Sequence, residues 1–158
     1  MAGIGCIANP HSQSNLRHPA RMKALARVLG QGGRFEPTGT LAELERAAAA
    51  FHADRIDILA ISGGDGTLHV VLSALVREYG DSAPLPLIAL LRGGTMNTIA
   101  RALGARAEGS RALGQLVGKY RTGAALRVVE RTLLQVGDKV GFLLSTSAAA
   151  SGPGWPVA

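Results

Sequence analysis

Cysteine, aromatic side chains and long apolar runs are scarce in this sequence of 158 residues. The single cysteine, Cys6, excludes a disulfide framework and a cysteine-based zinc site. Aromatic residues make up only 4% of the chain, which argues against the stacking platforms of single-stranded nucleic-acid binders, and we expect no nucleic-acid partner. The longest uninterrupted apolar run, residues 85–91, is far shorter than the ~20 residues of a membrane-spanning helix. Because the N-terminus also lacks the basic region of a signal peptide, we expect a cytoplasmic protein.

Basic residues outnumber acidic ones, and the excess lies in the second half of the chain. Residues 1–79 contain eight basic and seven acidic side chains, whereas residues 80–158 contain nine and four. Residues 92–131 alone carry eight basic side chains and two acidic ones. This bias either attracts phosphate ligands or an anionic membrane surface, or it is a solvated face, and composition leaves both readings open.

The pattern of apolar residues predicts an α/β domain over residues 1–122. Buried strands are expected at residues 3–8, 56–62 and 85–91, with a weaker one at 34–38. Helical spacing follows each of them, and Thr40 with Glu43 forms a capping box at one helix start. Strands that alternate with helices indicate a three-layer, doubly wound fold with a mainly parallel, Rossmann-like sheet.

The pattern changes after residue 122. Two extended segments, 128–136 and 139–144, flank Gly137-Asp138 and predict a β-hairpin over residues 123–144. Alternation predicts that one face of the hairpin is apolar, made by Leu134, Val136, Val140, Phe142 and Leu144. Because an isolated hairpin leaves its edges unpaired, we expect a homo-oligomer formed through it. Residues 145–158, rich in Ser, Ala, Gly and Pro, are expected to be an unstructured tail.

Two glycine-rich turns follow buried strands without a spacer: Gly63-Gly64-Asp65-Gly66-Thr67 and Gly93-Gly94-Thr95-Met96-Asn97. In open α/β sheets, ligands bind at the carboxyl ends of the strands. Glycine lets the backbone approach a ligand closely, and the N–H groups at the start of the next helix attract phosphate. The two turns therefore predict one polyphosphate cleft, although tight strand-to-helix connections also use glycine without any ligand.

Asp65 is the only carboxylate in either turn. It is a favoured residue type for capping the next helix. A carboxylate in a phosphate-binding turn also needs a compensating cation or proton, and phosphoryl transfer uses a metal ion. We therefore favour a functional role for Asp65. Thr67, Thr95 and Asn97 either cap helices or contact a nucleotide, and Arg92 either contacts phosphate or is solvated.

The first glycine turn resembles the G-G-D-G-T signature of the diacylglycerol kinase catalytic domain. That family shares a superfamily with sphingosine kinases, bacterial lipid kinases and, more distantly, NAD kinases. Asn9-Pro10, with Ser12 in register, resembles the family's N-P-x-S-G, and residues 94–101 resemble its G-T-x-N-D-F-A-R. The three motifs agree in order and spacing over residues 3 to about 104.

The chain departs from the family pattern at several positions. Gln13 replaces a glycine, Thr98 replaces an aspartate and Ile99 replaces a phenylalanine. Family members are about twice as long, and a β-rich second domain supplies much of their lipid pocket and an acidic residue often assigned as the base. The hairpin at 123–144 resembles the start of that domain, so we expect residues 1–158 to bind nucleotide without lipid kinase turnover.

The resemblance implies an ATP-dependent lipid kinase that transfers the γ-phosphate of ATP to a lipid hydroxyl, such as that of diacylglycerol. Asp65 would act on Mg²⁺, directly or through water, or on the attacking hydroxyl. The basic run at 92–131 would face anionic lipid headgroups at the inner face of the membrane. The nucleotide-binding positions are expected to be Asn9, Pro10, Ser12, Gly63, Gly64, Gly66, Thr67, Arg92, Gly94, Thr95 and Asn97.

Two alternatives remain open. One is an NAD-kinase-like enzyme with a soluble substrate, which would use the same Asp65 turn. The other is a truncated, non-catalytic nucleotide-binding module.

Overall fold

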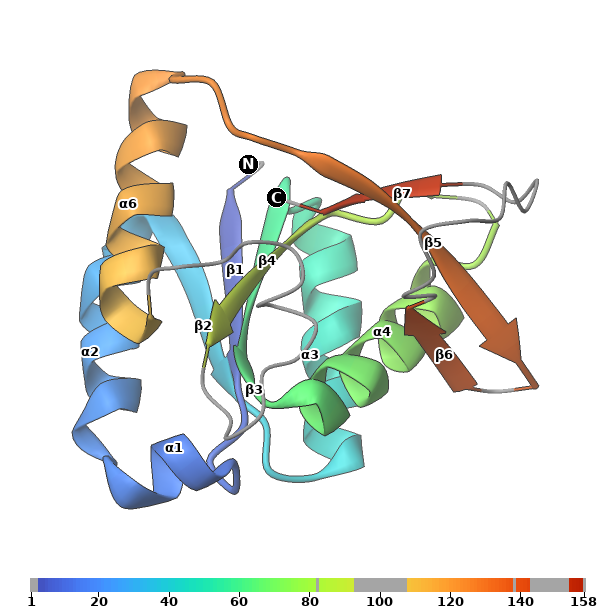
Figure 1. Cartoon of the computed structure of the whole chain (residues 1–158), viewed down its shortest axis with the longest axis horizontal. Helices are drawn as coiled ribbons and strands as arrows, with labels where there is room; N and C mark the ends of the chain where they lie inside the picture. The colour runs from blue at the N-terminus through green and yellow to red at the C-terminus, as the bar shows by residue number, and fades with distance from the viewer. Residues whose placement is uncertain (1–2, 82, 93–107, 138, 143–153, 158) are drawn as a thin grey trace.

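A computed structural model describes residues 3–81, 83–92, 108–137, 139–142 and 154–157. Seven strands form a sheet in the order β2-β1-β3-β4-β7-β5-β6 (Figure 1). The strands are β1 (Ile4–Ala8), β2 (Gly33–Pro37), β3 (Ile58–Gly63), β4 (Leu87–Arg92), β5 (Val129–Val136), β6 (Lys139–Phe142) and β7 (Gly154–Val157). The described helices are α1 (Gln13–Arg17), α2 (Ala20–Leu29), α3 (Leu41–Asp54), α4 (Asp65–Tyr79) and α6 (Gly109–Thr122), with a 3₁₀ turn at Gly30–Gly32.

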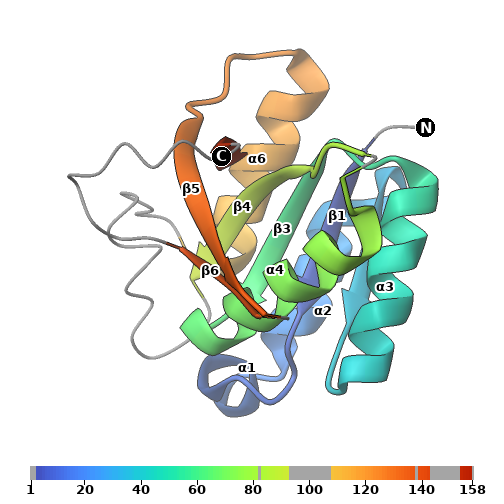
Figure 2. The same ribbon diagram turned by 90° about the vertical axis from the view of Figure 1, so that its right-hand side faces the viewer.

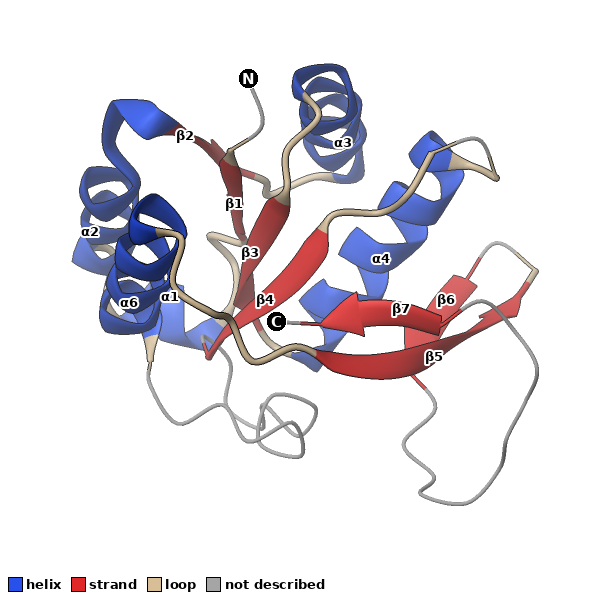
Figure 3. Cartoon of the chain, turned by 90° about the horizontal axis from the view of Figure 1, so that it is seen from above, coloured by secondary structure: helices blue, strands red, loops and turns tan. Residues whose placement is uncertain are grey.

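The first four strands pair in parallel, so their carboxyl ends share one edge of the sheet. Every residue of β1 and β3 is buried, as expected for strands covered on both faces. Helices α2 and α6 cover one face and α3 and α4 the other (Figure 3). The predicted three-layer, doubly wound fold is therefore confirmed. Within β1, Cys6 is fully buried, and burial raises the pKa of its thiol to about 12.

The helix starts follow the local sequence in α3 and depart from it in α1. The Thr40 hydroxyl accepts a hydrogen bond from the Glu43 N–H and the Glu43 carboxylate accepts one from the Thr40 N–H, so the predicted capping box is present. The backbone N–H groups of Gly39 and Thr40 both donate to the Glu43 carboxylate and lower its pKa. In α1, by contrast, the N-cap residue Ser12 makes no side-chain hydrogen bond to the helix.

In the turn between β3 and α4, Gly63 and Thr67 lie very close together. Gly64 occupies the N-cap position of α4, so Asp65 is the first helical residue and not the cap. A Cβ atom on Gly63 would lie 2.5 Å from Cβ of Thr67, whereas a Cβ on Gly66 would have nothing within 4 Å. Gly63 therefore has to be glycine for steric reasons, and Gly66 does not.

The predicted hairpin is present and packs against α4 (Figure 2). The Val140 N–H donates to Ser73 Oγ at 2.9 Å, and the Val140 carbonyl lies 3.3 Å from Nδ1 of His69. The Val140 side chain is only 4% exposed and belongs to the core between the sheet and α3 and α4. The hairpin is thus an integrated part of the fold.

The prediction that Leu134, Val136 and Val140 share one apolar face of the hairpin is wrong. The two-residue turn pairs Val136 with Lys139 and Gln135 with Val140, so odd-numbered side chains of β5 share a face with even-numbered ones of β6. Val140 therefore points to the core, while Leu134 and Val136 are 53% and 68% exposed on the other face. Self-association through the hairpin stays a prediction, and it now concerns only that outer face.

The expectation of an unstructured tail is wrong for residues 154–157. They form β7, which pairs in parallel with β4 at Ile88 and antiparallel with β5 (Figure 3). Local Gly and Pro content predicted a loop, but the free edges of β4 and β5 provide backbone partners that composition does not reveal. Residues 143–153 and 158 lie outside the described residues. The division at residue 122 falls in the connection between α6 and β5 and stays a proposal.

Among the described helices, none combines the length and the apolar character needed to cross a bilayer.

Removing methyl groups from Val140 tests the packing of the hairpin on α4. We expect Val140→Ala to lower the free energy of unfolding by about 1.5 kcal/mol, since each buried carbon contributes ~0.8 kcal/mol. The matched change Val136→Ala, on the exposed face, is expected to cost less than about 0.5 kcal/mol. Urea unfolding measures both values, and equal losses would contradict the packing described.

The turn at Gly63 gives a second paired test. Gly63→Ala forces Thr67 to move and is expected to destabilise the protein by ~1–3 kcal/mol. Gly66→Ala has open space around its new Cβ and lies inside α4, where alanine is favoured by ~0.5–1 kcal/mol. Urea unfolding of the two variants is therefore expected to give shifts of opposite sign. Similar shifts would show that Gly63 does not control the turn.

Candidate functional site

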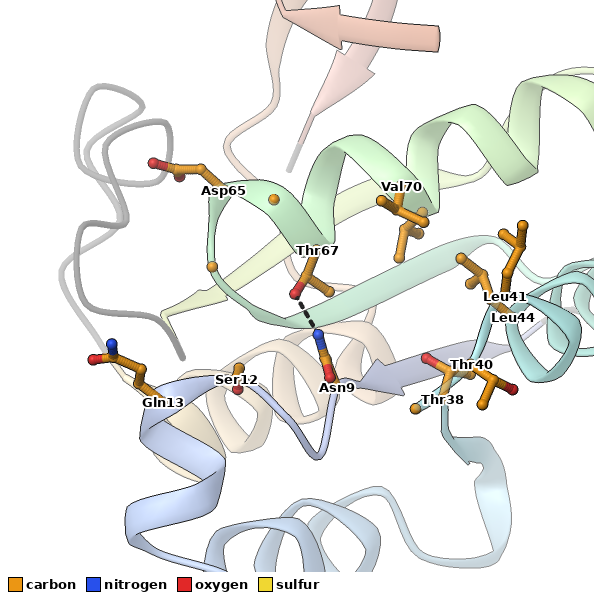
Figure 4. Close-up of a pocket in the computed structure, with 14 residues that line it drawn as sticks. Asn9, Ser12, Gln13, Thr38, Thr40, Leu41, Leu44, Asp65, Thr67 and Val70 are labelled. Carbon is orange, nitrogen blue, oxygen red and sulfur yellow. Dashed lines mark hydrogen bonds between the residues drawn. The ribbon is translucent and has the colours of Figure 1, made fainter. Parts of the chain in front are cut away.

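A cleft of ≈ 680 Å³ opens at the carboxyl edge of the sheet (Figure 4). Its walls come from the segments that follow β1, β2 and β3, together with the first turns of α3 and α4. The lining residues are Asn9, Ser12, Gln13, Thr38, Gly39, Thr40, Leu41, Leu44, Gly64, Asp65, Gly66, Thr67, Val70 and Val71.

Asn9 joins two of these segments by hydrogen bonds. Its Nδ2 donates to Thr67 Oγ1 at 2.9 Å, and its Oδ1 accepts from the His11 N–H at 2.8 Å (Figure 4). The Asn9 backbone N–H donates to the carbonyl of Ser62 at 3.0 Å. Because both ends of the amide are used, the loop after β1 and the turn after β3 hold a fixed relative position.

Several buried polar atoms at this edge of the sheet have no hydrogen-bond partner among the described residues. Asn15, 2% exposed, donates from Nδ2 to the Asn9 carbonyl at 2.7 Å. Among the described residues, no partner is present for the buried atoms Ser12 Oγ, Asn15 Oδ1 and Ser62 Oγ. Buried polar groups are usually paired. The edge therefore keeps hydrogen-bonding capacity beyond what its own described neighbours use.

Asp65 lies at the mouth of the cleft, on the same side as Gln13 and away from Leu41 and Val70 (Figure 4). Among the described residues that line the cleft, it is the only carboxylate. Within the described residues, no group of three or more His, Cys, Asp or Glu side chains could hold a metal ion. A metal here would therefore need ligands from a bound molecule as well as from Asp65.

The far wall of the cleft is apolar and was not predicted from the sequence. Leu41 and Val70 are 52% and 48% exposed. Leu41 and Leu44, from α3, lie opposite Val70, from α4 (Figure 4). Thr38 and Thr40 form the polar rim of that wall. The available signal was the position of this segment just after β2, because ligands bind at the carboxyl ends of parallel strands.

The structure brings some of the predicted nucleotide-binding residues together in the cleft and places others outside it. Asn9, Ser12, Gly64, Asp65, Gly66 and Thr67 line one cleft. Pro10, in the loop after β1, and Gly63, the last residue of β3, do not line it. Arg92 ends β4 outside the cleft lining and pairs with Glu108 at 3.2 Å. Gly94, Thr95 and Asn97 lie outside the described residues.

Comparison with known proteins adds a family to this geometry. A family model described as the diacylglycerol kinase catalytic domain matches residues 4–128. Proteins named "Probable lipid kinase YegS-like", from Xanthomonas euvesicatoria pv. vesicatoria (strain 85-10) and Xanthomonas campestris pv. campestris (strain 8004), are 40% identical over 60 residues. Those matches cover 38% of this chain and 19% of each relative.

A solved structure has the same fold. A diacylglycerol kinase from Bacillus anthracis str. Sterne superposes with a TM-score of 0.62 at 20% identity. The superposition covers 87% of this chain and 45% of that one, so the chain spans less than half the length of the solved kinase. Since the family model matches most of the sequence, this chain belongs to the diacylglycerol kinase catalytic domain family.

Proposed function

We propose that this chain holds the ATP site of a lipid kinase that transfers the γ-phosphate of ATP to a lipid hydroxyl, such as that of diacylglycerol. The observation that carries the proposal is the cleft in which the Asn9 loop, the Asp65 turn and an apolar wall meet, in a chain of this family. ATP combines a polyanion with an apolar base. The cleft offers the start of α4 to the polyanion and the apolar wall to the base.

The phosphates would lie at the start of α4. The N–H groups in the first turn of a helix have no acceptor within the helix, and the helix dipole favours an anion there. Gly64 and Gly66 add no side chain between that turn and a ligand. On this proposal the side chains of Asn9 and Ser12, across the cleft, approach the phosphates from the other side.

The adenine base would lie against Leu41, Leu44 and Val70. Leu41 and Val70 both line the cleft and expose about half of their surface, so together they offer an apolar patch to a ligand. Thr38 and Thr40 would supply the polar contacts that orient the base. The Glu43 carboxylate fixes this rim, because it accepts hydrogen bonds from the N–H groups of Gly39 and Thr40.

The single carboxylate of the cleft fits a magnesium ion carried by the nucleotide. Mg²⁺ usually binds through one or two carboxylates together with substrate phosphates, and Asp65, which lines the cleft, would take that role. The ion, when bound, offsets the negative charge of the phosphates. Asp65 would hold the nucleotide complex at the mouth of the cleft. There the acceptor oxygen would bond to the γ-phosphorus as the bond to ADP breaks, and the hydroxyl proton would be released to solvent.

The acceptor is identified by following a labelled phosphate. The chain is incubated with Mg²⁺ and γ-labelled ATP, together with either diacylglycerol in mixed micelles or NAD. Label in the lipid supports a lipid kinase, and label in NAD supports the NAD-kinase-like alternative. For residues 1–158 alone we expect ATP binding without transfer to either acceptor, because the family resemblance assigns much of the lipid pocket to a second domain, and a failure to bind ATP would contradict the proposed function.

The proposed contact with a membrane is electrostatic. Helices α2 and α6 lie side by side (Figure 3) and contain no acidic residue. Lys23, Lys119 and Arg121 are exposed on them and have no ion-pair partner among the described residues. On the opposite layer, by contrast, Arg77 pairs with Glu45. The α2/α6 face would therefore meet anionic headgroups, at about 1 kcal/mol per Lys or Arg near the surface.

Asp65→Asn tests the role of the carboxylate. We expect it to weaken Mg²⁺-dependent ATP binding at least tenfold, about 1.4 kcal/mol, as measured by calorimetry. Tm is expected to change little, because Asp65 is not the N-cap and its interaction with the helix dipole contributes only ~0.3–1 kcal/mol.

The matched control is Asp81→Asn, just beyond the other end of α4. It removes the same charge at an exposed site outside the cleft lining and is expected to leave ATP binding unchanged. Equal binding by wild type and Asp65→Asn would remove Asp65 from the site.

Vesicle binding tests the α2/α6 face. Sedimentation with anionic vesicles is expected to fall steeply from 0.01 M to 0.15 M salt, as the screening length shrinks from ~30 Å to ~8 Å. At low salt, the double change Lys23→Gln and Lys119→Gln is expected to weaken binding about thirtyfold, or ~2 kcal/mol.

The control removes two charges from the opposite layer, with Arg46→Gln and Arg77→Gln. It is expected to weaken vesicle binding much less. An equal loss in the two double variants would show that only net charge matters, and salt-independent binding to neutral vesicles would contradict the electrostatic contact altogether.

A further inference from the structure

Arg21, in the first turn of α2, connects two segments that are distant in the sequence. Its Nη1 donates to Ser14 Oγ at 2.6 Å, and its Nη2 donates to the backbone carbonyl of Arg92 at 3.1 Å. Ser14 lies in α1, directly after the loop that follows β1, and Arg92 is the last residue of β4. One guanidinium therefore joins the carboxyl ends of two parallel strands.

The start of α6 also lies against the Arg21 guanidinium. Arg92 pairs with Glu108 through a backbone bridge and through the ion pair at 3.2 Å. Gly109, which follows Glu108, has a φ of +50°, and a Cβ on it would lie 3.0 Å from Nη2 of Arg21. The glycine leaves the space that the guanidinium fills. Arg21 thus lies where α1, the end of β4 and the start of α6 meet.

Hydrogen bonds continue from this junction into the cleft. Asn15, the neighbour of Ser14 in α1, donates to the carbonyl of Asn9, and the Asn9 side chain donates to Thr67. The path from Arg21 through α1 therefore ends on the Asp65 turn. On the other side, β4 ends at Arg92, and the second glycine-rich turn of the sequence begins at the next residue.

We propose that Arg21 is a positioning residue for the nucleotide site: it fixes the loop after β1 relative to the end of β4. The inference rests on the proposed function only for the identity of the ligand. Arg21 does not line the cleft, so it acts through Ser14 and Asn15 and not by touching the nucleotide. The role requires a planar group with separated donors, which arginine has and lysine lacks.

The test is Arg21→Lys, which keeps the charge and removes the fork. Affinity for ATP with Mg²⁺ is expected to fall at least tenfold in calorimetry. In the nucleotide-free protein, the NMR signals of the Asn9 side-chain amide are expected to shift, because the loop that carries it loses its anchor. A purely structural contribution would lower Tm without moving that amide.

The matched control is Arg17→Lys, at the exposed end of α1, where the side chain makes no hydrogen bond or ion pair with another described residue. It is expected to change ATP affinity less than twofold and to leave the Asn9 amide in place. Ser14→Ala removes only one of the two acceptors, and a smaller shift of the same amide is expected from it. This variant keeps the test available if Arg21→Lys does not fold.

The outcomes separate this inference from the proposed function. Wild type that binds no ATP contradicts the proposed function, while the Asn9 signal still tests Arg21. An Asn9 amide that is unmoved in both Arg21→Lys and Ser14→Ala overturns the positioning role, whatever happens to affinity. Wild-type affinity in Arg21→Lys overturns it as well.

Discussion

The hydrogen bond from the Asn9 amide to the Thr67 hydroxyl, at 2.9 Å, is the contact on which the cleft depends. Parallel pairing of β1 with β3 brings Ala8 opposite Ser62, so the segments that follow them emerge together. Pairing alone would leave both loops free to move. The amide of Asn9 can donate to Thr67 and accept from His11 at once, which neither a carboxylate nor an apolar side chain can do.

Features encoded by a few consecutive residues could be predicted from the sequence. The apolar run at 56–62 gave β3 within two residues of its start, and the Thr40–Glu43 spacing gave the start of α3. The glycine turn was also correctly located between a buried strand and a helix. In each case the physical cause is local: burial on both faces, reciprocal hydrogen bonds, or a backbone free of side chains.

Features that depend on distant residues could not be predicted. The wall at Leu41 and Val70 exists only because β2 ends and α4 begins at the same edge of the sheet, and the contacts of Arg21 reach over 71 residues to Arg92. The hairpin face was assigned by alternation, whereas the pairing across the turn decides it. For Asp65 the alternative of helix capping was wrong by one position, since Gly64 occupies the N-cap position of α4.

Because Cys6 is fully buried in β1, the rate at which its thiol is chemically labelled can measure how often the sheet opens. The thiol lies in β1 between β2 and β3, and it is the only one in the sequence. In thiol labelling the thiolate attacks the reagent, and a pKa raised to about 12 leaves almost no thiolate at neutral pH. Modification therefore waits until β1 separates from its neighbours. The rate of labelling reports how often the sheet that carries the cleft opens, without an introduced probe.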